Sequence, residues 1–107
     1  MIQVLFWSRL RPDMDDAAEQ EYQTRLGDMV KLAESHAGFI SHKTYTAPDG
    51  ERLTVVEFED EAALNAWRDL PQHREAQHRG RQAFYDEYRT LVLKPLRGNT
   101  WKRPRGT

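Results

Sequence analysis

The chain has 107 residues, of which 38% are hydrophobic, 31% charged and 10% aromatic. This length and balance predict one folded domain and exclude both a two-domain protein and a disordered chain. The sequence contains no cysteine, which excludes disulfides, thiolate catalysis and cysteine-ligated zinc or iron–sulfur sites.

Charge is distributed unevenly along the chain. Residues 94–107 carry five basic side chains and no acidic one, whereas the preceding residues carry eleven basic and seventeen acidic ones. Because phosphate contacts need a basic surface on the fold itself, the acidic body argues against nucleic-acid binding. We expect residues 1–95 to form the domain and residues 96–107 to form a basic C-terminal tail.

The first predicted element is a short strand over residues 2–10, where branched and aromatic side chains are concentrated. Gln3, Ser8 and Arg9 interrupt this apolar run, so it suits neither a signal-peptide core nor a membrane span. We therefore expect a cytoplasmic protein that does not associate with membranes.

A long amphipathic helix is the next predicted element. Apolar residues recur at intervals of three and four from Ala18 to Ala33, and three aspartates over residues 13–16 precede them. Gly38 can adopt the left-handed conformation that closes a helix. The spacing therefore predicts a helix that ends near residues 35–38.

Residues 38–60 predict a β-hairpin, because two strand-like runs meet at a turn that contains Pro48 and Gly50. Asp60 then suits the cap of a short helix that carries Trp67 on its apolar side and ends before Pro71. A second helical segment is expected to follow that proline.

The second helical segment is expected to turn one face toward the sheet. His73, Ala76, Gln77 and Gly80 share that face, whereas His78 points elsewhere. Two of these residues are small, and we expect them to leave room beside His73.

The predicted order β-α-β-β-α-α-β indicates an α+β fold, the ferredoxin-like split β-α-β arrangement with an antiparallel four-stranded sheet. In a monomer the face of the sheet away from the helices should be polar, yet several strands carry apolar side chains on both faces. In the last strand the alternation assigns Phe84, Tyr88, Thr90 and Val92 to one face and Tyr85, Leu91 and Leu93 to the other. The simplest cover for the second face is another copy, so we expect a homodimer whose sheets close into a dimeric α+β barrel.

Motifs within residues 36–89 resemble the antibiotic-biosynthesis monooxygenase family of the dimeric α+β barrel superfamily. The motifs are a Gly-Phe pair that opens the second strand, a hairpin that ends in an acidic helix start, an aromatic last strand, and Pro71, His73, Ala76 and Gly80 at fixed offsets after Trp67. The resemblance spans residues 1–95. It implies the barrel fold, and either oxidation of phenols and hydroquinones by O₂ without a cofactor or binding and degradation of haem.

Oxidation of a phenol without a cofactor requires a base, a desolvated aromatic pocket and a donor for the developing anion. His73 is the expected base, and the resemblance implies that Trp67 borders the pocket with its indole NH available to a substrate oxygen. The alternative roles are a half-buried histidine bonded to backbone and a tryptophan of the core. The side chains expected to bind the small aromatic substrate are Trp7, Arg9, Tyr22, Gln77 and Tyr88.

The resemblance to the haem-degrading members is incomplete. In those members an asparagine precedes the Arg-Leu pair at the end of the first strand and a histidine ligates haem, whereas Ser8 and Gln77 stand at these positions here. Haem binding is therefore disfavoured, and no cofactor is expected. His73 and His78 do not share a helical face, so no metal site is expected either.

The quinone-forming members carry an asparagine one turn before the helix tryptophan, where this chain has Ala63. A non-catalytic dimer that binds a small ligand is therefore the alternative to a cofactor-independent monooxygenase.

Overall fold

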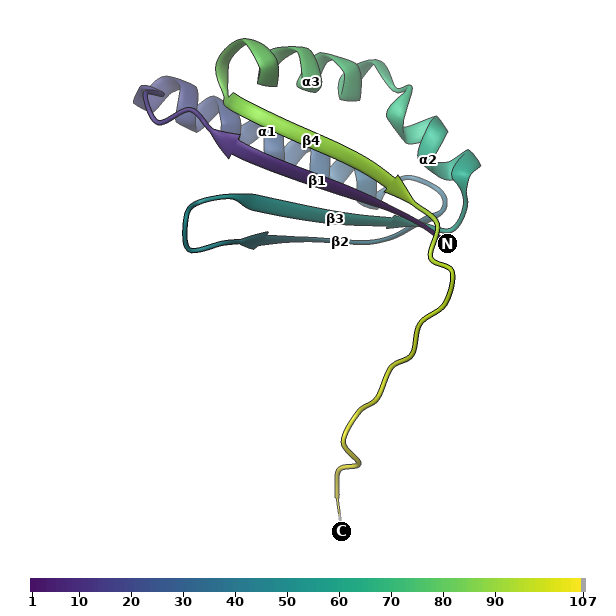
Figure 1. Ribbon diagram of the computed structural model, residues 1–107. Helices are drawn as coiled ribbons and strands as arrows, with labels where there is room; N and C mark the ends of the chain where they lie inside the picture. Colours follow the sequence, from purple (N-terminus) through teal and green to yellow (C-terminus); the bar gives the residue numbers. More distant parts are fainter. Residues whose placement is uncertain (107) are drawn as a thin grey trace.

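The computed structural model describes residues 1–106 and confirms the predicted order of elements (Figure 1). In chain order these are β1 (Ile2–Leu10), α1 (Asp16–Glu34), β2 (Phe39–Thr46), β3 (Arg52–Phe58), α2 (Glu61–Arg68), α3 (Pro71–Ala83) and β4 (Tyr85–Leu93).

The four strands form one antiparallel sheet in the order β2-β3-β1-β4. The three helices lie on one side of this sheet (Figure 1). The α+β ferredoxin-like arrangement predicted from the sequence is therefore confirmed. Within residues 1–106, the other side of the sheet carries no helix.

The core lies between the central strands and α2. Ile2 and Val4 of β1 and Val56 and Phe58 of β3 are buried together with Leu64 of α2. Adjacent strand residues point to opposite faces, so this buried set defines the face of the sheet that meets the helices. Trp67 packs against the same cluster.

Two helices begin at the aspartates expected to cap them. The Asp15 carboxylate accepts a hydrogen bond from the Ala18 amide, and the Asp60 carboxylate accepts one from the Ala63 amide, both at 2.8 Å. A cap of this kind satisfies one of the free amides of the first helical turn. The third helix, α3, has no side-chain cap and begins instead at Pro71, whose missing N–H costs nothing at that position.

Gly38 joins α1 to β2 at a point where only glycine fits. Its φ is +84°, in the left-handed region, and a Cβ at this position would lie 2.5 Å from the Ala63 Cβ. The glycine thus lets the start of β2 pass directly against the first turn of α2.

The start of β4 departs from the alternation that the sequence predicted. The sequence placed Tyr85 on the same face as Leu91 and Leu93, but its ring lies 5.7 Å from the Phe6 ring and 6.2 Å from the Tyr22 ring, on the helix side. The register between β1 and β4 shifts between Arg9 and Leu10. A bulge of this kind turns the following side chain to the other face, which explains the wrong assignment.

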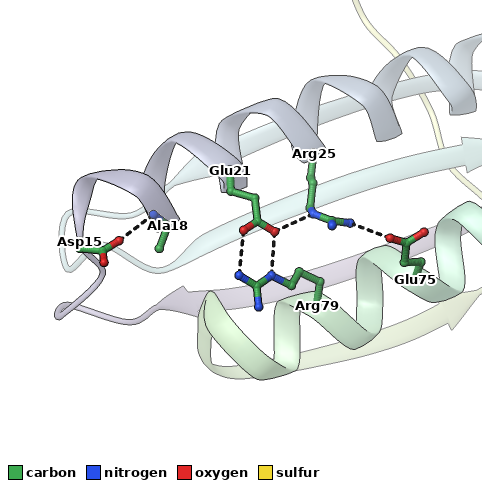
Figure 2. A network of polar contacts seen from close by, with 6 residues as sticks. All are labelled: Asp15, Ala18, Glu21, Arg25, Glu75 and Arg79. Atoms are coloured by element: carbon green, nitrogen blue, oxygen red, sulfur yellow. Dashed lines mark hydrogen bonds and ion pairs between the residues drawn. The ribbon is translucent and has the colours of Figure 1, made fainter.

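Charged side chains join α1 to α3 across their outer surfaces. Arg79 donates two hydrogen bonds to the Glu21 carboxylate at 2.7 and 2.8 Å, and Arg25 donates a third at 2.9 Å. Arg25 also lies 3.5 Å from Glu75 (Figure 2). Hydrogen bonding from Arg79 is the main cause that lowers the pKa of Glu21 from 4.5 to about 2.

This network predicts a measurable effect of acid on stability. Since the folded pKa of Glu21 lies below its ordinary value, its stabilising effect is present above pH 4.5 and is lost as the pH falls toward about 2. Glu21→Gln is expected to lower stability near neutral pH and to flatten its decline across that acidic range. Urea unfolding at several pH values measures this. Glu19→Gln is the matched control on the same helix, and an equal flattening in that control would contradict the assignment.

The side of the sheet without helices is apolar at its centre and polar at both ends. We call this the helix-free face; its central side chains are Leu5, Trp7, Leu53, Val55, Leu91 and Leu93. At one end Glu57 accepts hydrogen bonds from Gln3 and Ser41. At the other end Arg9 pairs with Asp49.

No helix within residues 1–106 is long and apolar enough to cross a membrane. The last strand ends at Leu93, and residues 94–106 form neither helix nor strand. Figure 1 shows this stretch leaving the sheet in an extended conformation, away from the helices.

Candidate functional site

Two aromatic rings meet where α2 passes into α3. The Trp67 and His73 ring centroids lie 4.0 Å apart, and the Phe58 ring lies 5.4 Å from Trp67 on the sheet side. The short connection through Leu70 to Pro71 brings the two side chains together, because α2 ends at Arg68 and α3 begins at Pro71. The structure therefore joins the two residues that the sequence singled out as catalytic.

Each of these rings has a buried nitrogen with no hydrogen-bond partner. Among the described residues, Trp67 Nε1 and His73 Nδ1 are the buried side-chain nitrogen or oxygen atoms left unpaired. An unpaired buried polar group costs about 1–3 kcal/mol, and native proteins rarely tolerate it without a reason. The indole nitrogen can only donate a hydrogen bond, whereas the unprotonated imidazole nitrogen can accept one. The pair thus offers one donor and one acceptor to a ligand.

The surroundings of His73 favour its neutral form. Burial is the main cause that lowers the pKa of His73 below its ordinary 6.5; a hydrogen bond to the Arg68 backbone raises it, and the Arg68 guanidinium lowers it further. This backbone contact is the one that the alternative, structural role of His73 requires. At neutral pH the imidazole is therefore uncharged. An uncharged imidazole can accept a proton, as a general base must.

Ala76 and Gly80 were expected to leave an open pocket beside His73. At Gly80 the Tyr85 ring fills this space. A Cβ at Gly80 would lie 2.6 Å from the Tyr85 ring, so this glycine admits the tyrosine and leaves no gap. Ala76 lies instead along the groove between α1 and α3. The expectation that these small residues open a pocket beside His73 is therefore wrong for Gly80.

Two of the predicted substrate-binding residues belong to an aromatic cluster around the start of β4. Tyr22 is buried, accepts a hydrogen bond from Arg52 at 2.8 Å and packs 5.5 Å from the Phe84 ring. Burial is the main cause that raises its pKa, so Tyr22 stays protonated. The Tyr88 hydroxyl accepts a hydrogen bond from Arg81 at 3.1 Å. The ring contacts of Tyr22 and Tyr88 are with Phe6, Phe84 and Tyr85 and not with His73.

The other three predicted substrate-binding residues also lie apart from His73. Trp7 and Arg9 alternate with the buried Val4 and Ser8, so they face the helix-free side. Gln77 is exposed on α3. Within one chain, the structure therefore separates these residues from the pair of buried nitrogens.

Two arginines that act on Tyr22 and His73 were not predicted from the sequence. Arg52 bonds the Tyr22 hydroxyl, and Arg68 influences the charge of His73. Arg52 could have been found from the alternation of β3, because it shares a face with Val56 and Phe58. Arg68 could not be predicted, because no pattern in the sequence shows that the chain turns after this residue and brings His73 close to it.

A metal ion needs several ligating side chains gathered at one place. Over residues 1–106 no group of three or more His, Asp or Glu side chains is arranged to hold a metal ion.

Comparisons with known proteins identify relatives of the whole fold. A curated relative, the uncharacterized protein YqjZ of Bacillus subtilis, is 33% identical over 66 residues; the match covers 62% of this chain and 58% of that protein. Rv0793 of Mycobacterium tuberculosis superposes with a TM-score of 0.76 at 21% identity, covering 92% of this chain and 98% of the other.

A second similar structure is SnoaB of Streptomyces nogalater, a cofactor-independent oxygenase. It superposes with a TM-score of 0.71 at 9% identity and covers 91% of this chain and 94% of its own. At these identities the two superpositions show the shared fold. The sequence model of the antibiotic biosynthesis monooxygenase family matches residues 1–79. Together with the fold, this match shows that the chain belongs to the antibiotic biosynthesis monooxygenase family.

Proposed function

We propose that the protein is a cofactor-independent monooxygenase that oxidises a phenolic or hydroquinone-type small molecule with O₂. The observation that carries this proposal is the buried, unpaired nitrogen pair of Trp67 and His73. Family membership and the fold shared with the oxygenase SnoaB support the same reaction class. Because fold alone does not fix function, the roles below rest on the side chains of this chain.

His73 acts as the base in this proposal. Its Nδ1 accepts the phenol proton, and the Trp67 indole N–H donates a hydrogen bond to the resulting phenolate oxygen. Both nitrogens are shielded from solvent in the free chain, so the substrate must open the contact between α2 and α3 to reach them. Once bound, it lies where water is excluded and the two polar groups act at full strength.

The phenolate itself supplies all the electrons. It reduces O₂, one oxygen atom bonds to a ring carbon that carries hydrogen, ortho or para to a hydroxyl in a phenol and ortho in a hydroquinone, and the other leaves as water. The hydroxyl proton and the proton of that ring carbon both end in this water. One phenol and one O₂ thus give one quinone and one water, and the four electrons that O₂ gains are the four that the ring loses. No outside reductant is needed.

Oxygen uptake tests the proposal. The chelator-treated protein is mixed with a panel of phenols and hydroquinones in an oxygen electrode, and quinone is followed by absorbance. We expect one O₂ consumed per quinone formed, without hydrogen peroxide. Binding without any oxygen uptake across the panel would instead favour the non-catalytic ligand-binding dimer. A Soret shift on titration with haemin would favour haem binding.

The pKa of His73 predicts the pH dependence of the reaction. The base must be neutral, so the rate should fall as the medium becomes acidic and His73 is protonated. Because burial lowers this pKa in the free protein, the acidic fall in kcat/KM should lie below pH 6.5. A pH–rate profile in the same oxygen assay measures this midpoint, and a midpoint above 6.5 would contradict a buried histidine base.

We also propose that the protein is a homodimer paired through the helix-free face. In a single copy this face exposes apolar side chains, with Leu91 at 44% and Leu93 at 38% exposure. An apolar centre with a polar rim is the usual anatomy of a protein interface. Two copies that share this face would bury both apolar centres around a two-fold axis.

The dimer predicts a specific response to substitution. Light scattering should give about twice the mass of the 12.6 kDa chain, since two copies pair. Leu91→Lys places a charge at the centre of the helix-free face and should yield the monomer. Ala62→Lys, on the exposed side of α2, is the control and should remain dimeric. A monomeric wild-type protein would refute this part of the proposal.

A further inference from the structure

The stretch that follows β4 exposes apolar side chains that its own domain does not cover. We call residues 94–105 the basic segment. Leu96 is 94% exposed and Trp101 is 69% exposed. The Arg103 guanidinium stacks over the Trp101 ring at 5.0 Å, so the largest side chain of the segment already has a cation on one face. Tryptophan and arginine are the residues most often responsible for affinity at protein interfaces.

The basic segment carries five positive charges, at Lys94, Arg97, Lys102, Arg103 and Arg105. Within residues 1–106 none of its five basic side chains takes part in an ion pair, whereas many acidic residues of the body are exposed. The residues before the segment carry six more acidic than basic side chains. Opposite net charges on segment and body favour their association.

The basic segment extends away from the domain of its own chain. Figure 1 shows it leaving the end of β4 and running to the side opposite α2 and α3. The proposed second copy would pack on the helix-free side. Twelve extended residues reach about 40 Å, whereas a nine-residue strand such as β4 is about 30 Å long. The segment is therefore long enough to cross the partner's sheet at whatever angle the two sheets meet.

A groove at the polar end of the helix-free face suits a cation beside an aromatic ring. The groove has a volume of about 290 Å³, and its lining includes Trp7, Arg9, Glu51, Glu87 and Arg89. Arg89 stacks on the Trp7 ring at 4.0 Å, so one cation of this groove already lies against an aromatic ring.

Arg9 is shared among three carboxylates, two of which line the groove. It lies 2.8, 3.9 and 3.2 Å from Asp49, Glu51 and Glu87, and within residues 1–106 no other cation forms an ion pair with these three. Asp49 and Glu87 are 61% and 68% exposed, so both retain oxygen atoms that can accept further hydrogen bonds.

We propose that the basic segment of one copy docks in this groove of the second copy, with Arg103 beside Glu87 and Trp101 against the rim of the groove. This inference rests on the homodimer proposed above. In the dimer each segment then acts as a strap across the partner. The strap covers the exposed indole and brings the unpaired cations to the carboxylates around Arg9.

Crosslinking tests the contact directly, because the chain has no cysteine of its own. Arg103→Cys is prepared in the untagged full-length chain, and Glu87→Cys in a full-length chain that carries an added tag. The two proteins are mixed and mildly oxidised. We expect a disulfide-linked species of mixed length. The control replaces Glu87→Cys by Thr90→Cys, because Thr90 pairs with Phe6 and lies exposed on the other side of β4. Equal crosslinking of both pairs, or of neither, would overturn the docking site.

A second measurement separates the strap from the dimer itself. Sedimentation should show that a chain ending at residue 95 dissociates at least tenfold more readily than the full chain. It should also show that Glu87→Lys weakens the full-length dimer while Thr90→Lys, on the helix side of β4, does not. Added salt should reduce the difference between full and shortened chains. Equal dissociation constants for the two chains would refute the strap and leave the dimer standing. A monomeric full chain would refute both.

One more outcome would contradict the proposal. If the shortened chain dimerises normally and only the full chain binds DNA or vesicles of anionic lipid, the basic segment recognises a polyanion and not its partner subunit.

Discussion

Replacing His73 by phenylalanine is expected to lower the kcat for oxygen uptake by about 10²- to 10⁴-fold, the usual contribution of a positioned base. Phenylalanine keeps an aromatic ring against Trp67 but removes the nitrogen that accepts the substrate proton. Replacement of a buried unpaired polar atom by an apolar group does not cost stability. We therefore expect the thermal midpoint of His73→Phe to equal or exceed that of the wild type.

The control for this loss is His78→Phe on the same helix. His78 is exposed, so its replacement should leave kcat unchanged. Trp67→Phe removes only the indole donor and should lower kcat by about 10²-fold, the typical effect of losing one donor to a developing anion. Oxygen-electrode rates for the three variants measure these effects. Unchanged turnover in His73→Phe would remove the histidine from the mechanism.

Gly38→Ala is expected to lower the free energy of unfolding by about 3 kcal/mol. The left-handed conformation costs a non-glycine residue about 1–2 kcal/mol, and the added Cβ overlaps the Ala63 Cβ at 2.5 Å, which adds about 1–3 kcal/mol. Urea unfolding followed by circular dichroism measures the change.

A second substitution separates the two causes. Ala63→Gly in the Gly38→Ala background removes the overlap but keeps the strained backbone, so it should restore only part of the stability. Gly27→Ala is the control: Gly27 lies within α1 with no atom close to its missing Cβ, and alanine favours a helix by about 1 kcal/mol. Equal destabilisation by Gly38→Ala and Gly27→Ala would contradict the close approach of β2 and α2.

Most of the fold could be predicted because its signals are local. The spacing of apolar residues defines α1, the aspartates at 15 and 60 mark two helix starts, and Pro71 separates α2 from α3. The ring of Tyr85 could not be placed, because the bulge that turns it depends on how β4 pairs with β1. A shift of register between distant strands leaves no trace in periodicity.

The candidate site was predictable only in part. Helical spacing placed Trp67 and His73 on the inner side of their helices, but their ring contact depends on the angle between α2 and α3, which spacing does not determine. Trp7 and Arg9 were assigned to the substrate on the basis of residue type. Their alternation with Val4 and Ser8 places them on the helix-free face, and that reasoning was available from the sequence.

The central claim is that the Trp67 and His73 nitrogens form the ligand site. Nitrogen-15 NMR during a titration with 1,4-dihydroxynaphthalene, kept reduced under nitrogen gas, tests it most directly. The indole signal of Trp67, identified by its loss in Trp67→Phe, and the imidazole signals of His73 should shift together at the same ligand concentration. Binding that shifts other residues and leaves both of these unchanged would contradict the account.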